Sequence, residues 1–194
     1  MSDGCLMWTG RNKNLQAVLI SSNDKEIMQY LHDNMCVGNK LYELNNAKNY
    51  LVRYRNQEAI NFMKQHGLVE RKSLIVQFPN NIPNEVMPDF IRGYFDGNGS
   101  MILSKTEYNV YGQVSFAIGS KDFADGLSNK LKNYGVQNQI YVETRHTSYY
   151  LRVTKRSEIE KFYNLIYKDK TIFLNRKHDK FLELFSHELK YDIA

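Results

Sequence analysis

Two copies of one residue pattern follow each other in this chain, and this repeat constrains the fold more than any other feature. SDGCLMW matches GNGSMIL, AVLISSNDKEIMQYL matches VSFAIGSKDFADGL, and YLVRYRNQEAINFM matches YYLRVTKRSEIEKFY, each just under a hundred residues further along. Each copy is expected to run in the order ββαββα. Because a duplicated unit of this kind buries its apolar side within itself and beside its copy, we expect an α+β protein whose tandem ββαββα repeats form a pseudo-two-fold saddle.

Turn residues and helix caps set the expected limits of these elements. In the first copy we expect strands at residues 5–8, 16–20, 41–44 and 49–55 and helices at 24–37 and 57–66. In the second copy we expect strands at 101–105, 111–118, 140–145 and 148–154, helices at 121–134 and 157–167, and a further packing helix from residue 175. Asn23 and Glu26 form a capping-box pattern, and Ser120 is the expected N-cap in the second copy.

The boundary between the copies is expected in a proline-rich stretch. All three prolines, Pro79, Pro83 and Pro88, lie among asparagines between the two repeats. Proline interrupts helices and central strands, so such a stretch is typical of a connection. We therefore expect a first half at residues 1–78, a linker at 79–88, and a second half at 89–194 that includes the C-terminal helix.

Composition excludes several classes of protein. No run approaches the ~18 consecutive apolar residues of a membrane span, while 42% hydrophobic residues are enough for a core. Cys5 and Cys36 show no metal-type spacing, which argues against a zinc ribbon or a secreted disulfide scaffold. With no apolar leader at its start, the chain is expected to be cytoplasmic. Its many Asn, Lys, Ile and Tyr residues indicate a phage, low-GC bacterial or organellar origin.

The segment PDFIRGYFDGNGS, residues 88–100, carries the most specific pattern. Pro88 suits the first turn of a helix, and Phe90 and Tyr94 belong to an apolar stripe along it. Gly93 lies in the middle, where glycine costs about 1 kcal/mol relative to alanine. Close approach of another helix is the usual compensation, so we expect a second helix to pack on Gly93.

IRGYFDGNG resembles, position by position, the nine-residue motif of the LAGLIDADG (DOD-type) homing endonucleases. The repeat extends the resemblance over essentially the whole chain, because family members with two motifs repeat a ββαββα half after each one. The resemblance implies a site-specific double-stranded DNA endonuclease, of intron, intein or phage type, that hydrolyses phosphodiesters with Mg²⁺ or Mn²⁺ at a long asymmetric site. It also implies a motif helix that contains Phe90, Gly93, Tyr94, Asp96 and Gly97.

The acidic residues of the family are only partly present. Asn98 stands where the second motif has its catalytic acid, and an uncharged amide makes a weak Mg²⁺ ligand. MSDGC resembles the tail of a first motif whose helix is missing from this sequence, with Asp3 as the acid; with that helix restored, a monomer is expected. Asp96 is interpreted as a structural or capping carboxylate. By resemblance, the catalytic residues are Asp3, Asn98 and Lys155, and the metal site contains Asp3, Asn98, Gly4 and Gly99.

The family lays its curved sheets along the major groove of DNA, which a two-stranded ribbon can enter. Strand parity then divides the residues into two faces. Those expected to face the helices are Val114, Phe116, Ile118, Ile140, Val142, Leu151 and Val153. Those expected to contact DNA are Arg53, Arg55, Gln113, Ser115, Tyr141, Arg145, Tyr150, Arg152 and Thr154.

The net charge of +5 supports a polyanionic partner only weakly, but its distribution is uneven. Residues 98–194 hold fifteen basic and eleven acidic side chains, against eleven and ten before them. A basic cluster near the C-terminus reads either as a phosphate clamp or as an ordinary soluble helix edge. Its members are Lys168, Lys170, Arg176, Lys177 and Lys180, of which Lys177 is the expected phosphate contact.

Two alternatives to the endonuclease remain open. Asn98 favours a site-specific DNA-binding protein, or a maturase that binds intron RNA, with the same fold and no cleavage. A decayed, inactive gene product is the third reading.

Overall fold

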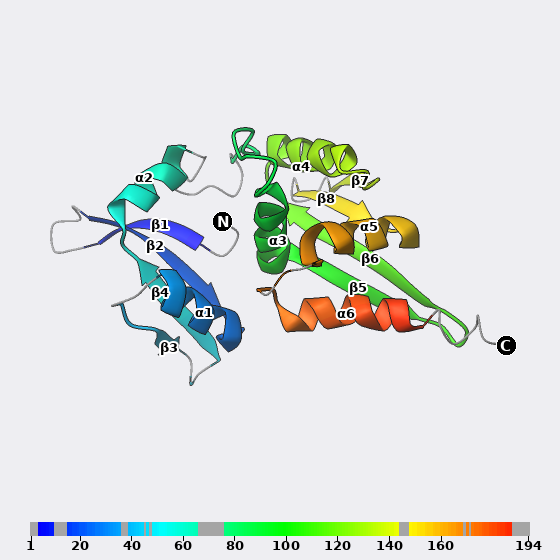
Figure 1. The fold of residues 1–194 in the computed structure, drawn as a ribbon, viewed down its shortest axis with the longest axis horizontal. Helices are drawn as coiled ribbons and strands as arrows, with labels where there is room; N and C mark the ends of the chain where they lie inside the picture. Colours follow the sequence, from blue (N-terminus) through cyan, green and yellow to red (C-terminus); the bar gives the residue numbers. More distant parts are fainter. Residues whose placement is uncertain are drawn as a thin grey trace. The chain divides into compact units, whose positions relative to one another are not determined.

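The structure, a computed structural model, describes residues 4–9, 15–35, 39–44, 46, 48–65, 76–143, 148–168, 170 and 172–187. It divides into two compact units, Met1–Lys72 and Ser73–Ala194. Each unit contains one four-stranded antiparallel sheet with helices packed on it (Figure 1). Within the described ranges, the helices are all too short or too polar to span a bilayer.

The first unit follows the expected order of elements. These are β1 (Gly4–Thr9), β2 (Leu15–Ser22), α1 (Lys25–Met35), β3 (Tyr42–Leu44), β4 (Asn49–Tyr54) and α2 (Gln57–Gln65), and the strand order is β1-β2-β4-β3. Polar side chains before α1 form further hydrogen bonds. Ser22 Oγ accepts the Asp24 N–H at 3.1 Å, whereas the Asn23 side chain accepts a bond from Asn49.

The second unit repeats this topology. Its elements are α3 (Met87–Asn98), β5 (Gly99–Lys105), β6 (Val110–Ile118), α4 (Lys121–Asn133), β7 (Gln139–Glu143), β8 (Ser148–Val153), α5 (Arg156–Tyr167) and α6 (Asn175–Ser186). The strand order, β5-β6-β8-β7, matches that of the first unit and confirms the predicted α+β repeat. Ser120 caps α4 by accepting the Phe123 N–H, and Gly135 follows with a positive φ of 80°.

Strand parity separates a buried face of the second sheet from an open one. Val114, Phe116, Leu151 and Val153 are completely buried, as predicted. Val142 was expected on the same face but is 58% exposed, because β7 is an edge strand with a neighbour on one side only.

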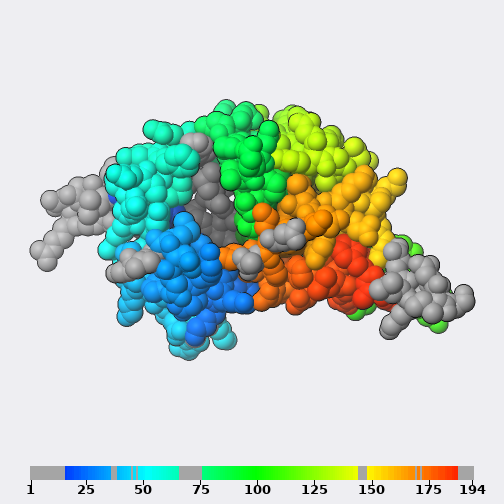
Figure 2. All heavy atoms as spheres, in the orientation of Figure 1, coloured from blue at the N-terminus to red at the C-terminus, as the bar shows by residue number. Residues whose placement is uncertain are grey.

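An aromatic cluster fixes the helices of the second unit on the buried face. The Phe95 ring lies 5.5 Å from Phe116, 5.3 Å from Phe162 and 5.8 Å from Phe181, in edge-to-face contacts. These rings come from α3, β6, α5 and α6, so one cluster joins the sheet to three helices. Figure 2 shows these helices as a packed layer, running from green α3 through orange α5 to the orange-red α6.

The proline-rich stretch belongs to the second unit and packs on its helices. Phe78 is 5% exposed and contacts the rings of Phe90 and Phe123. It also covers Gly126 of α4 so closely that a Cβ there would overlap the Phe78 side chain. The Tyr134 hydroxyl donates to the Asn84 carbonyl at 3.0 Å. The segment that precedes α3 is therefore part of the packing that positions α3.

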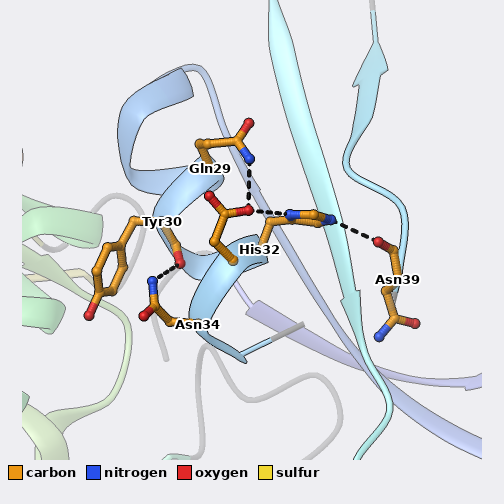
Figure 3. Close-up of polar contacts among 6 residues, drawn as sticks. Gln29, Tyr30, His32, Asn34 and Asn39 are labelled. Carbon is orange, nitrogen blue, oxygen red and sulfur yellow. Dashed lines mark hydrogen bonds and ion pairs between the residues drawn. The ribbon is translucent and has the colours of Figure 1, made fainter. Parts of the chain in front are cut away.

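In the first unit, His32 ties the end of α1 to the chain that leads into β3 (Figure 3). Its Nδ1 lies 2.7 Å from Asp33 Oδ1 and its Nε2 lies 2.8 Å from the Asn39 carbonyl. Because both partners are acceptors, the protonated ring, in which both nitrogens donate, satisfies both contacts at once. The hydrogen bond to Asp33 accordingly raises the pKa of His32.

This geometry predicts a pH dependence of stability. A histidine pKa raised by folding contributes stability that is complete below its unfolded value of about 6.5 and is lost as pH rises through the folded value. NMR titration should place the pKa of His32 above 6.5, and Asp33→Asn should lower it. The His32→Gln variant should lack this part of the pH dependence. Equal His32 pKa values in the wild type and Asp33→Asn would contradict the assignment.

Candidate nucleic-acid interface

The end of α3 brings Asn98 to the start of β5. Gly99 follows at once and is buried against Phe95, where a Cβ would overlap the phenyl ring. The Asn98 amide is hydrogen-bonded to the Tyr94 hydroxyl one turn earlier, and burial raises the pKa of Tyr94. A buried ring thus orients the polar side chain at the end of the motif helix.

A pocket of about 270 Å³ opens beside Asn98. Its lining consists of Gly97, Asn98, Gly99, Ser100, Met101, Arg176, Lys177 and Lys180. Every charged side chain in this lining is cationic. Arg176 and Lys180 are exposed, and Lys180 also donates to the Met101 carbonyl at 3.1 Å. The pocket is therefore suited to an anion such as a phosphate.

Lys177 lines the pocket but is buried, and its ammonium is already bonded within the protein, so its expected contact with DNA stays a prediction. It is only 5% exposed, and its ammonium donates to the carbonyls of Phe95 at 2.8 Å, Asp96 at 2.7 Å and Gly99 at 2.5 Å. These carbonyls lie at or just past the end of α3, where helices leave acceptors without partners. Its positive charge also opposes the negative end of the helix dipole.

Asp96 lies in the packing rather than in the pocket lining. The Tyr167 hydroxyl donates to its carboxylate at 2.7 Å and the Leu174 N–H donates at 3.3 Å. Burial raises the pKa of Asp96, and these hydrogen bonds oppose that shift. Asp96 thus joins α3 to α5 and to the start of α6, which is the arrangement of a structural carboxylate.

On the second sheet, the polar residues of the open face form a row across the strands. Ser100, Ser115, Arg152 and Gln139 lie opposite one another on β5, β6, β8 and β7. Tyr150 and Tyr141 form a neighbouring pair, and Gln113 lies opposite Ile102. Tyr141 is 43% exposed. The structure thus brings five predicted DNA contacts of this unit, Gln113, Ser115, Tyr141, Tyr150 and Arg152, onto one open face.

The remaining predicted residues are more scattered. Thr154 and Lys155 are exposed after β8; Lys155 is the N-cap residue of α5 and does not line the pocket beside Asn98. In the first unit, Arg53 and Arg55 share a face, and Arg55 is exposed. Asp3 and Arg145 lie outside the described residues, and Gly4 is the first residue of β1. In the described chain, a Cβ on Gly93 would meet no atom within 4 Å, so no helix packs on it there.

One residue of the open sheet faces was not predicted from the sequence, and fewer residues of the basic cluster reach the pocket than the sequence suggested. Tyr42 lies under the Arg53 guanidinium and was not predicted, although it occupies the position equivalent to Tyr141 in the repeat. Of the cluster, Lys170 is paired with Asp89 at 3.0 Å, and Lys168 is exposed. Only Arg176, Lys177 and Lys180 reach the pocket.

Comparison with known proteins connects the second unit to one family. Residues 85–167 match the family described as LAGLIDADG-like domain. The probable translation initiation factor IF-2 of Methanocaldococcus jannaschii is 25% identical over 187 residues, which is 90% of this chain and 16% of that protein. The chain therefore spans about a sixth of the length of this relative.

Solved structures of homing endonucleases share the fold. Meganuclease I-SmaMI bound to uncleaveable DNA superposes with a TM-score of 0.67 at 14% identity, over 98% of this chain and 88% of that one. The LAGLIDADG meganuclease I-AabMI bound to uncleaved DNA gives 0.67 at 16% identity with the same coverages. Homing endonuclease I-DmoI gives 0.57 at 20% identity, over 86% and 88%.

The role of Lys177 can be measured as stability. Lys177→Met should lower the free energy of unfolding by about 3 kcal/mol, because it removes the buried ammonium that the carbonyls of Phe95, Asp96 and Gly99 share. The Phe95 carbonyl keeps one donor, the Gly99 N–H. Lys180→Met is the matched control; it removes one partly buried bond and should cost about 1 kcal/mol or less. Urea denaturation measures both. Equal losses in the two variants would show that the ammonium of Lys177 does not hold the end of α3.

Proposed function

We propose that this chain is a site-specific double-stranded DNA endonuclease of the homing type. The premise is that it carries a LAGLIDADG-like domain and has the fold of LAGLIDADG homing endonucleases. The observation that carries the proposal is the cationic pocket at the end of the motif helix α3, beside Asn98. In each unit, an open sheet face carries arginine: Arg53 in the first and Arg152 in the second. Such faces suit contacts with base edges, and the pocket suits a backbone phosphate.

The resemblance to the family implies a divalent metal ion, and the residues expected to hold it can be compared with the ligands that such an ion prefers. Asp3, Asn98, Gly4 and Gly99 would be the residues that hold Mg²⁺ or Mn²⁺, which would activate a water and stabilise charge on the phosphate. In the pocket described beside Asn98, the lining offers an uncharged amide and three cationic side chains. A hard dication prefers carboxylate oxygens, so these residues do not fit a metal ion in this half, and Arg176 and Lys180 would bind the phosphate directly.

This misfit supports a second candidate function, a DNA-binding protein or intron RNA maturase that does not cleave. Both candidate functions use the same sheet faces to bind nucleic acid. They differ in whether the residues around Asn98 support cleavage. We also propose that the exposed Gly93 face of α3 packs against a first motif helix, and that a protein with both helices is a monomer on its asymmetric site.

The decisive variant is Asn98→Asp, which restores a carboxylate to the pocket. If the fold retains nuclease chemistry, it should increase Mg²⁺- or Mn²⁺-dependent nicking of a selected duplex by roughly tenfold or more. Asn164→Asp on α5, an exposed residue, adds the same charge away from the pocket and should leave nicking unchanged. Gel shifts with the same duplex report binding independently.

Binding without nicking in both wild type and Asn98→Asp, also in a version that carries a first motif helix, would select the non-cleaving candidate. Binding of intron RNA instead of the duplex would select the maturase. Absence of binding to either nucleic acid would reject both functions.

A further inference from the structure

The two units carry the same arginine–tyrosine pair at equivalent places in their sheets. The Arg53 guanidinium carbon on β4 lies 5.0 Å from the centre of the Tyr42 ring on β3. The Arg152 carbon on β8 lies 4.9 Å from the centre of the Tyr141 ring on β7. In each sheet the tyrosine lies opposite the residue two positions before the arginine, so the two pairs have the same diagonal geometry.

Both arginines are held in place without being neutralised. Their Nε atoms are buried and have no hydrogen-bond partner, and in the described chain neither guanidinium pairs with a carboxylate. Arg92 provides a contrast, because it is bonded to Asp89 at 2.6 Å. Stacking on a ring fixes the plane of a guanidinium while leaving its terminal N–H groups available. The remaining donors of Arg53 and Arg152 are therefore oriented for a ligand outside the protein.

We propose that Arg53 and Arg152 are equivalent guanine-reading residues, so that the target duplex carries a G·C pair at matching positions of its two half-sites. This inference rests on the proposed binding to double-stranded DNA. A planar guanidinium donates in bidentate fashion to guanine O6 and N7 in the major groove. Arg152 lies within a row of Ser115 and Gln139 on the sheet face. This mid-sheet position favours a base edge over a phosphate.

The neighbours of the two arginines differ, so the half-sites are not identical. Arg152 lies opposite Ser115, whereas Arg53 lies opposite the half-buried Leu19. A hydroxyl can bond to a base edge, while a leucine offers only apolar contact of the kind that suits a thymine methyl group. The shared guanine is thus combined with different flanking bases, which is how a duplicated protein reads an asymmetric site.

Selection from a randomised duplex library, with the full chain and EDTA to prevent cleavage, tests this proposal and identifies the target sequence in the same experiment. The wild type should enrich two half-sites with G·C at matching positions. Arg152→Lys keeps the charge but loses the bidentate geometry, and should reduce the preference for guanine about 5- to 150-fold in one half-site only. Arg53→Lys should do the same in the other, and Tyr141→Leu should weaken the preference near Arg152 by freeing its side chain.

Control variants and the alternative outcomes keep the result interpretable. Lys161→Gln, on the helical side of the second unit, should leave the selected sequence unchanged, and thermal unfolding checks each variant for folding. If Arg→Lys weakens binding equally on all sequences and lowers the salt dependence, the arginines contact phosphate and the guanine assignment is wrong. Enrichment of a site without matching guanines overturns the inference and leaves DNA binding intact. Failure of the wild type to enrich any sequence overturns the proposed function itself.

Discussion

The ammonium group of Lys177 is the contact on which the organisation of the second unit depends. It lies where α3 ends and β5 begins, and it bonds to carbonyls on both sides of that junction. The same residue belongs to α6, so one side chain joins the motif helix, the first strand and the last helix. Tyr167 of α5 reinforces this junction by donating to the carboxylate of Asp96 on α3. The position of Asn98, and hence of the pocket beside it, follows from this buried network.

Much of the fold could be predicted from residue patterns because the relevant physics is local or periodic. The repeat predicted the order of elements in each half, alternation predicted the buried residues of β6 and β8, and Ser120 predicted the start of α4. The exposure of Val142 was not predicted, because alternation identifies the face of a strand but not how far the helices cover an edge strand.

The site was less predictable because it depends on contacts that are distant in the sequence. A lysine among other lysines and arginines gives no signal that it is buried, so Lys177 could be recognised only once α6 was placed against α3. The pocket likewise combines residues 97–101 with residues from α6. Tyr42, by contrast, was within reach of sequence reasoning. Aligning the two copies places it at the position of Tyr141, beside an arginine that both copies share.

The division of each strand into a buried and an open parity has an evolutionary consequence. Val114, Phe116, Leu151 and Val153 maintain the core of the second unit, while Gln113, Ser115 and Arg152 between them make no contribution to that core. Substitutions on the open face therefore leave the apolar core in place. Each unit can change its surface while its neighbour is unaltered, so a duplicated ancestor could move to new sequences one half at a time.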